Sequence, residues 1–282
     1  MNSSLVTRHS SLERANALRG FTLLELIIVV GIMIFLTVLS IPAFTSRKPA
    51  EDLTNAANTI TSMMEQARTL AISKNTYTWL GFYEEDATDS GPTTSTPPYP
   101  GKGRLVMAIV YSKDGTGIYE IGLSQYQSGS WPLNQPSGGK EPSATDPIAM
   151  SGTIVKIENV HIGDIGSPTP SPVPSPSPDS LDARSGEPYS SPIPADSHFN
   201  RISSDSADAT RFQFTARGYT FYKTIRFSPR GEARLNTYYD FRRMCELGLI
   251  PTRGKVIPNP TPANVIAIQF SAFGGHFKIY RR

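Results

Sequence analysis

The sequence predicts an α+β protein in which a long N-terminal helix packs on a mainly antiparallel β-sheet head. One continuous apolar segment occupies residues 21–44, and residues 45–75 repeat small and apolar side chains at helical spacing. From residue 76 to residue 282, short stretches rich in valine, isoleucine and aromatic residues alternate with turn-forming residues. A helix followed by many short strands is typical of this fold class, because the helix must bury its apolar stripe against a sheet.

The overall composition excludes several classes of protein. A mean hydropathy of −0.25 excludes a protein with many membrane-spanning helices. The single cysteine, Cys245, excludes an intrachain disulfide and a cysteine-based zinc cluster. A net charge of +3 argues against a generally basic nucleic-acid binder.

The charges are unevenly distributed along the chain. Residues 75–198 hold 14 acidic and 6 basic side chains, whereas residues 199–282 hold 5 acidic and 14 basic ones. Such asymmetry can mark an interaction surface. Alternatively, the fold intermixes the two parts and their fields partly cancel.

The apolar segment is long enough to cross a membrane. It contains no charged residue between Leu26 and Leu39. As a helix, residues 21–44 would be about 36 Å long, against roughly 30 Å for a bilayer core. Arginines at positions 8, 14 and 19 precede the segment, so the positive-inside rule favours a cytoplasmic N-terminus and an exported C-terminal body.

Two other interpretations of this segment explain less. A removable secretory signal usually has an apolar region of about 7–15 residues and a small-residue cleavage site, and neither is present. A plain membrane anchor leaves Glu25 unexplained, because a carboxylate at membrane depth costs several kcal/mol unless it is neutralised or paired. A new α-amino group, produced by cleavage of this or a neighbouring chain, would be a suitable partner for it.

The start of the segment resembles a known processing signal. A basic leader, then Gly20, Phe21 and an acidic residue four positions later, Glu25, stand at the head of the apolar run. This arrangement resembles the class III signal of type IV pilins and type II secretion pseudopilins. The resemblance implies that a prepilin peptidase cuts after Gly20, so that residues 1–20 form a cleaved leader, and that it N-methylates Phe21. It also implies that Glu25 pairs with a neighbouring subunit's N-terminus during assembly, and Pro42 stands where the family often has a helix-kinking proline.

Residues 45–75 predict an amphipathic helix. Apolar or small residues recur with i, i+3, i+4, i+7 spacing from Leu53 to Ala71. Together with the apolar segment they could form one helix of roughly 80 Å, bent near Pro42 and Pro49. The phrase E-Q-A-R-T-L-A-I, at residues 65–72, resembles a stretch of the GspH/FimT type of minor pseudopilins.

The remainder, residues 76–282, predicts a β-rich head. Three residues, Lys113 to Gly115, fit a hairpin turn between two of the strands. The motif I-x-F-x-P-x-G at residues 225–231 resembles a segment of the GspH-type head. The candidate strands are residues 76–83, 104–111, 117–126, 153–162, 211–215, 219–227, 265–270 and 276–280.

Two regions of the head predict loops. Residues 166–197 hold nine prolines and contain no run that could bury a core, so we expect a surface insertion between strands, with a partner-recognition loop as the alternative. The second region, residues 84–103, begins with an acidic run. The carboxylates of Glu84, Glu85, Asp86 and Asp89 could bind calcium, but the EF-hand spacing is absent, and a solvated acidic loop is favoured.

The residue types of catalytic sites occur without their usual spacing. The four histidines are far apart in the sequence, and no metalloprotease, hydrolase or phosphate-binding motif occurs. Residues 137–140 match S-x-x-K, but the turn-rich surroundings offer no helix to carry them. Cys245 follows two arginines, which could lower its pKa, although a buried structural cysteine is favoured. We therefore expect no enzyme, no cofactor and no metal site.

The C-terminal part mixes basic and aromatic residues. Such a mixture can follow a nucleic-acid backbone and stack bases, and Lys278, Arg281 and Arg282 are the candidate DNA contacts. In alternating strands the same pattern simply places aromatic side chains inward and basic ones outward, and this second interpretation is favoured. Nucleic acid is therefore a possible partner that the sequence does not favour.

These observations lead to one expectation of function and one alternative. The resemblance implies a minor pseudopilin or pilin-like subunit of a type II secretion or type IV pilus machine. It would be a single-pass protein of the bacterial inner membrane with a periplasmic head, and its partners would be other pilin subunits, the prepilin peptidase and the inner-membrane assembly platform. The alternative is a DNA-binding minor pilin for DNA uptake. A third class, an anchored protein of other function, would match the leader by chance.

Overall fold

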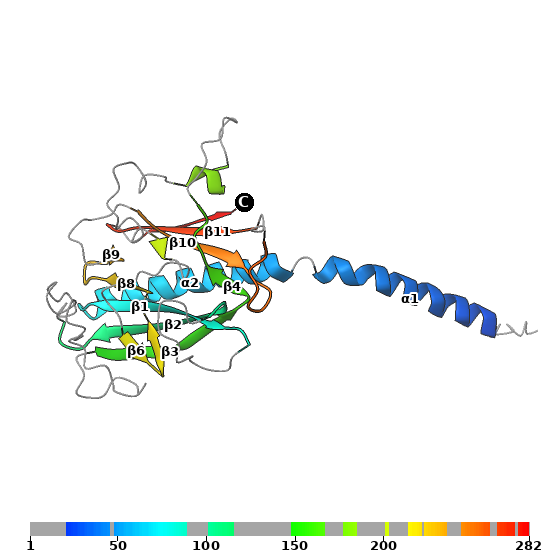
Figure 1. Ribbon diagram of the computed structural model, residues 1–282, viewed down its shortest axis with the longest axis horizontal. Coiled ribbons are helices and arrows are strands. Elements are labelled where there is room, and N and C mark those ends of the chain that lie inside the picture. The colour runs from blue at the N-terminus through cyan, green and yellow to red at the C-terminus, as the bar shows by residue number, and fades with distance from the viewer. Residues whose placement is uncertain are drawn as a thin grey trace, which may run out of the picture. The chain divides into compact units, whose positions relative to one another are not determined.

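The computed structural model describes eleven stretches of the 282-residue chain. They are residues 21–45, 48–88, 101–115, 148–166, 177–184, 201–202, 214–221, 223–235, 244–259, 264–273 and 276–281. The chain divides into two compact units, Met1–Arg47 and Lys48–Arg282, which are described separately. Figure 1 shows both units and labels most of their helices and strands.

The described residues of the first unit form the helix α1 (Leu23–Thr45). Thr22 precedes it and accepts a hydrogen bond from the backbone N–H of Glu25 onto its side-chain oxygen, at 3.2 Å. A threonine followed three residues later by glutamate is the capping-box sequence, which satisfies amide groups that a helix start leaves without partners. The side chains of residues 21–38 are all exposed.

No helix in the described part of the chain is long and apolar enough to cross a membrane. The prediction of a single-pass inner-membrane protein, with its N-terminus in the cytoplasm and its head in the periplasm, is therefore contradicted.

The second unit begins with α2 (Lys48–Ser73), so residues 21–75 form two helices and not the single long helix that was predicted. Proline lacks an amide hydrogen, and its ring clashes with the carbonyl of the residue four positions earlier in a continuous helix. For Pro49 that residue is Thr45, where α1 ends. As the second residue of α2, Pro49 lies in the first turn, where proline is tolerated. The predicted bend at Pro42 does not divide the helix, since α1 continues past it.

Sheet A has five strands in the order β3-β2-β1-β8-β9, and every neighbouring pair is antiparallel. Its strands are β1 (Thr78–Asp86), β2 (Gly103–Ser112), β3 (Ile148–Glu158), β8 (Lys223–Phe227) and β9 (Ala233–Arg234). Because β2 pairs with β3, the hairpin predicted between residues 104–111 and 117–126 is not formed by β2, and residues 117–126 lie outside the described stretches.

Sheet B has four strands in the order β12-β11-β10-β4, and a short fifth strand pairs in parallel with β10. Its strands are β4 (Val160–Ile162), β5 (Arg201–Ile202), β10 (Met244–Pro251), β11 (Ile266–Ser271) and β12 (Phe277–Arg281). A 3-10 helix, η1 (Leu181–Ala183), lies within the proline-rich insertion.

A two-stranded hairpin, β6 (Phe214–Ala216) and β7 (Tyr219–Phe221), packs on sheet A. Its two turn residues, Arg217 and Gly218, have positive φ angles of 49° and 83°, which fits a type I′ turn. Gly81 of β1 lies under the hairpin, where an added Cβ atom would come within 2.6 Å of the Phe221 side chain. The absence of a side chain at Gly81 therefore lets the hairpin approach the sheet closely.

The fold-class prediction of a long N-terminal helix packed on a mainly antiparallel β-sheet head is wrong. The described stretches contain two separate helices, and those of the second unit are rich in strands, with two five-stranded sheets and a hairpin. Strand patterns in a sequence show where strands lie but not which strands pair. The division into two sheets could not be read from them.

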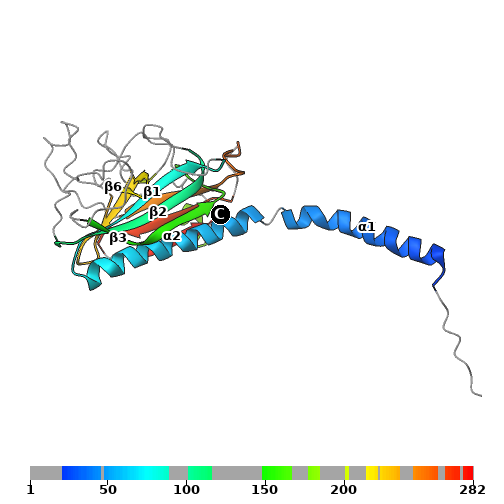
Figure 2. The same ribbon diagram turned by 90° about the horizontal axis from the view of Figure 1, so that it is seen from below.

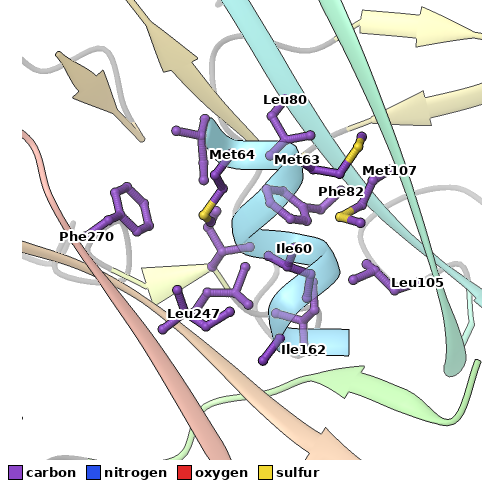
Figure 3. Packing of buried hydrophobic residues seen from close by; sticks show 14 of the residues in the cluster. Ile60, Met63, Met64, Leu80, Phe82, Leu105, Met107, Ile162, Leu247 and Phe270 are labelled. Atoms are coloured by element: carbon purple, nitrogen blue, oxygen red, sulfur yellow. The ribbon is translucent and has the colours of Figure 1, made fainter. Parts of the chain in front are cut away.

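The main core forms where α2 contacts strands of both sheets. Figure 2 shows α2 running along β1, β2 and β3. Figure 3 shows Ile60, Met63 and Met64 of α2 between side chains of sheet A and of sheet B. Those from sheet A include Leu80, Phe82, Leu105 and Met107, and those from sheet B include Ile162, Leu247 and Phe270. Burying such a side chain contributes about 1.5–3 kcal/mol, so α2 holds the two sheets together.

Replacing Ile60 tests this arrangement. Ile60 is fully buried, so Ile60→Ala should lower the free energy of unfolding by about 2–5 kcal/mol, because it leaves a cavity between the sheets. Ser62→Ala, at an exposed position of the same helix, should change it by less than about 0.5 kcal/mol. Urea unfolding of the full chain measures both. Equal stability of the two variants would contradict the packing.

Candidate functional site

Three glutamates are buried in the described part of the head, and strand alternation decides where each one points. Glu84 and Glu85 are consecutive residues of β1 and are 2% and 0% exposed. Successive side chains of a strand point to opposite faces. The third, Glu246 of β10, is 3% exposed. An unpaired buried carboxylate is costly, so each needs a partner from the layer it faces.

Glu85 points to the hairpin side of sheet A and is bonded to three side chains. Lys156 of β3 donates to Oε1 at 2.9 Å, and Arg104 of β2 donates to the same oxygen at 2.9 Å. The Tyr219 hydroxyl of the hairpin donates to Oε2 at 2.8 Å and accepts from Lys156 at 2.7 Å. Arg104 also donates to Glu158. These bonds tie β1, β2, β3 and the hairpin together.

The partners of Glu85 change its protonation. Burial by itself raises the pKa of Glu85. The hydrogen bonds from Lys156, Tyr219 and Arg104 together lower the pKa by more than burial raises it, so it lies below its ordinary value of 4.5. Burial raises the pKa of Tyr219 above its ordinary value. Glu85 is therefore ionised and Tyr219 is neutral near pH 7.

Glu84 points to the opposite face of β1, toward sheet B. Its carboxylate lies 2.8 Å and 3.0 Å from Nδ1 of His161 in β4, and both side chains are fully buried. Its oxygens also accept the backbone N–H of Gly103 at 3.0 Å and of Ile162 at 3.4 Å. This carboxylate therefore links β1, the central strand of sheet A, to β4 at the edge of sheet B.

Glu246 faces the outer side of sheet B. Arg184 donates to it at 2.9 Å, and Gln269 of β11 donates to its other oxygen at 2.8 Å. Arg184 belongs to the proline-rich insertion and is itself buried. The third carboxylate thus holds part of the insertion against the sheet.

These side chains form ion pairs and do not form a metal site. Glu84 and Glu85 lie on opposite faces of β1, so they cannot converge on the calcium ion considered for the acidic run, and the predicted loop begins only after Asp86. Asp89 lies outside the described residues. In the described stretches no three histidine, cysteine, aspartate or glutamate side chains gather as metal ligands.

Sequence reasoning placed the acidic residues in a loop and missed their strand. One signal could have found them. In register, Glu85 stands opposite Arg104 in the neighbouring strand, so the two runs carry complementary charges across the sheet. The role of Arg184 had no comparable local signal, since its partner Glu246 is distant in the sequence.

The sequence-predicted site residues fall in several places. Gly20 and Arg282 lie outside the described residues, as do residues 137–140. Phe21 is 77% exposed, and Glu25 lies in the first turn of α1. The helix α1 also includes Pro42.

The remaining candidates lie in sheet B. Cys245 is a buried residue of β10. On β12, Lys278 lies 4.0 Å from Asp179, and the backbone N–H of Arg281 donates to the Asp179 carbonyl at 2.8 Å.

In the described part of the chain, most of the exposed large hydrophobic side chains lie on α1 and on Phe21 just before it. Of the large hydrophobic side chains described as exposed, 14 lie between Phe21 and Val38 and only three lie elsewhere, at Ile72, Val256 and Phe273. Monomeric proteins rarely expose continuous apolar patches of this kind unless they bind something. The apolar surface of α1, with Glu25 at its start, is therefore the candidate functional site.

Comparison with known proteins gives no relative. No protein-family model matches the chain, and no curated protein and no solved structure shows significant similarity to it.

Replacing Glu85 tests the buried network. Glu85→Gln keeps the shape but removes the carboxylate that pairs with Lys156 and one of the two carboxylates that pair with Arg104, which keeps Glu158. The free energy of unfolding at pH 7 should fall by about 2–3 kcal/mol, less than for a fully buried pair because the side chains of Lys156 and Arg104 are 38% and 16% exposed. Glu158→Gln, at a side chain that is 54% exposed, is the matched control and should cost less than about 1 kcal/mol.

The same variant predicts a pH dependence of known sign. Because the folded pKa of Glu85 is lowered, its stabilising effect is complete above the ordinary value of 4.5 and is lost as the pH falls through the folded pKa. The difference in unfolding free energy between the original chain and Glu85→Gln should therefore shrink below pH 4.5. A difference that stays constant from pH 7 to pH 3 would refute the network.

Proposed function

We propose that this chain is a pilin-like structural subunit, of the minor pseudopilin type, in a type II secretion or type IV pilus machine. Cleavage by a prepilin peptidase after Gly20 makes Phe21 the N-terminus of the mature subunit, and α1 assembles with the equivalent helices of other subunits. The role is structural: helix packing performs it, and no covalent chemistry is involved after processing.

The exposed apolar surface of α1 carries this proposal. The 14 large hydrophobic side chains of residues 21–38 are exposed over 41–77% of their surface. Each such side chain gains about 1.5–3 kcal/mol when it is buried, so side-by-side packing of several α1 helices is strongly favoured. This surface begins directly after the glycine that the processing signal requires.

Glu25 has two tasks in this proposal. Its backbone N–H bonds to Thr22 at the start of α1, and an acidic residue in the first turn suits the positive end of the helix dipole. In an assembly, the apolar neighbours would bury its carboxylate, and the α-amino group of a processed Phe21 on the next subunit would neutralise it. A charge in this position fixes the register between subunits, because a shifted helix would leave it unpaired.

The contacts of the basic C-terminal residues do not favour the DNA-binding alternative. Lys278 lies beside the carboxylate of Asp179, which weakens its attraction for phosphate. The strand β12 that carries it is bonded along its edge to residues of the insertion. We therefore base the proposal on α1 alone.

Processing is the first test. Gly20→Arg should abolish cleavage in a host that contains a prepilin peptidase, because a bulky side chain replaces the residue before the scissile bond. Intact-mass measurement of the purified chain should show loss of residues 1–20 with a methylated Phe21 in the original and the full-length mass in the variant. An original chain that keeps residues 1–20 beside an active peptidase would overturn the assignment.

Glu25 is the second test, and two variants separate its tasks. Glu25→Gln keeps the capping-box residue type but removes the charge, whereas Glu25→Ala removes both. Both variants should be processed, and both should co-assemble with other pilin subunits at least about tenfold less well, as the loss of roughly 1.4 kcal/mol or more predicts. Co-purification with a tagged subunit measures this. Normal assembly of Glu25→Gln would refute the pairing role and leave only the cap.

A further inference from the structure

One buried ionisable pair takes no part in the proposed function and lies where the two sheets meet. The side chains of Glu84 in β1 and His161 in β4 are 0% exposed, and the histidine Nδ1 lies 2.8 Å and 3.0 Å from the two carboxylate oxygens. An ionised carboxylate only accepts hydrogen bonds, so Nδ1 carries a proton and donates it in this contact. A second proton, on Nε2, decides whether the pair holds a net charge.

The chain passes from sheet A to sheet B beside this pair. β3 ends at Glu158, β4 begins at Val160, and Asn159 between them has a positive φ angle of 60°. The backbone N–H of Asn159 donates to the Gly103 carbonyl at 2.8 Å, and its carbonyl accepts the N–H of Thr252 at 3.0 Å. This corner therefore joins the start of β2 to the residue that follows β10.

The Glu84 carboxylate accepts hydrogen bonds from three parts of this corner. Besides its contact with His161, it accepts the backbone N–H of Gly103 at 3.0 Å and that of Ile162 at 3.4 Å. The strands β1, β2 and β4 therefore converge on one carboxylate, and its bonds hold the edge strand of sheet B to the central strand of sheet A. A change in the charge of the pair acts directly on this junction.

The elements packed against β4 in the described part of the chain carry other charged groups, and these have partners of their own. Asp52 of α2 accepts a hydrogen bond from the corner asparagine at 3.3 Å. Arg104 of β2 donates to carboxylates on the hairpin side of sheet A, and Glu246 of β10 is paired with an arginine of the insertion. The residue of β10 that stands opposite His161 in register is the apolar Ile250.

Burial gives the protonation of His161 a large effect. With a neutral imidazole the pair buries one net negative charge, whereas with a protonated imidazole the pair is neutral overall. A buried charge without a counter-charge is costly. Gly163 also packs so closely that an added Cβ atom would lie 3.2 Å from Nε2. The imidazole should therefore keep its proton at a pH at which an exposed histidine, with a pKa of about 6.5, has lost it.

We propose that this pair is a pH-sensitive latch, which holds β4 against β1 while His161 is protonated and loosens their junction when the proton is lost. Because the closed junction binds the proton more tightly than an open one, the latch is complete below about pH 6.5 and is lost as the pH rises through the histidine titration of the folded chain. Between these two values, each pH unit should shift the equilibrium about tenfold toward opening. The latch belongs to the second unit alone, so it does not depend on the pilin-like role.

Nuclear magnetic resonance of the isotope-labelled full chain tests the latch, in mild detergent because α1 exposes its apolar side chains. The imidazole signals give the titration of each histidine, and the exposed His276 serves as the internal reference. His161 should titrate at least about one pH unit above His276, between about pH 7 and pH 9. A midpoint at or below that of His276, or a proton retained throughout this range, would overturn the proposal.

Hydrogen exchange of backbone amides in the same sample measures opening of the junction. Gly103 and Ile162 donate to Glu84, so their exchange, corrected for the intrinsic rate, should accelerate about tenfold per pH unit from about pH 6.5 to the histidine midpoint. Ser112 at the other end of β2 is the control, because its N–H donates to a backbone carbonyl at 2.9 Å, and it should not accelerate. Equal acceleration at Ser112 would mean that the whole head responds and would refute a local latch.

The two adjacent glutamates of β1 provide a matched pair of variants. Glu84→Gln removes the counter-charge of His161, so the histidine should titrate no higher than His276 and the acceleration at the junction should disappear. Glu85→Gln removes an equally buried carboxylate that points to the other face of β1, and it should leave both effects in place. Loss of the effects in both variants, or in neither, would contradict the latch. If Glu84→Gln does not fold, the titration and exchange of the original chain still decide.

Discussion

The head depends on the burial of one face of α2 against two sheets at once. Ile60, Met63 and Met64 have neighbours from both sheets, so neither sheet has a complete core without the helix. This constraint explains the other layers. With their inner faces occupied by α2, both sheets have an outer face that still needs cover: the β6–β7 hairpin covers sheet A, and part of the insertion covers sheet B.

The buried glutamates connect these layers. Alternation along β1 sends Glu84 toward sheet B and Glu85 toward the hairpin, so two adjacent residues fasten the strand on both sides. Glu246 does the same for the insertion on the outside of sheet B. A shift of one residue in the register of β1 or β10 would turn each carboxylate to the other face of its sheet, away from its partner. Ion pairs of this kind contribute more to a unique register than to net stability.

The sequence was informative about elements and silent about their partners. Apolar spacing between Leu53 and Ala71 marks the buried face of α2, because helical periodicity is a local property. The pairing of β1 with β8 joins distant residues, and no local pattern encodes it. The acidic run suggested a loop because strands rarely bury charges. Partners from other elements, among them Arg104, Lys156 and His161, make the burial possible. The role of Arg184 could not be predicted either, because its partner Glu246 is distant in the sequence. The apolar composition of residues 21–44 already indicated the candidate site on α1. It did not indicate that α1 and α2 are separate helices.

The pairing of the first strand with a late one also decides when the head can finish folding. Thr78 in β1 needs Phe227 in β8 as its neighbour, and a ribosome that adds about 5–20 residues per second reaches β8 roughly 7–30 s after β1. Sheet B comes later still, since β10, β11 and β12 are the last strands of the chain. The apolar face of α2 emerges first and is covered last. During synthesis this chain therefore exposes an amphipathic helix for many seconds, which makes it a substrate for chaperones that hold nascent chains and makes its head intolerant of C-terminal truncation.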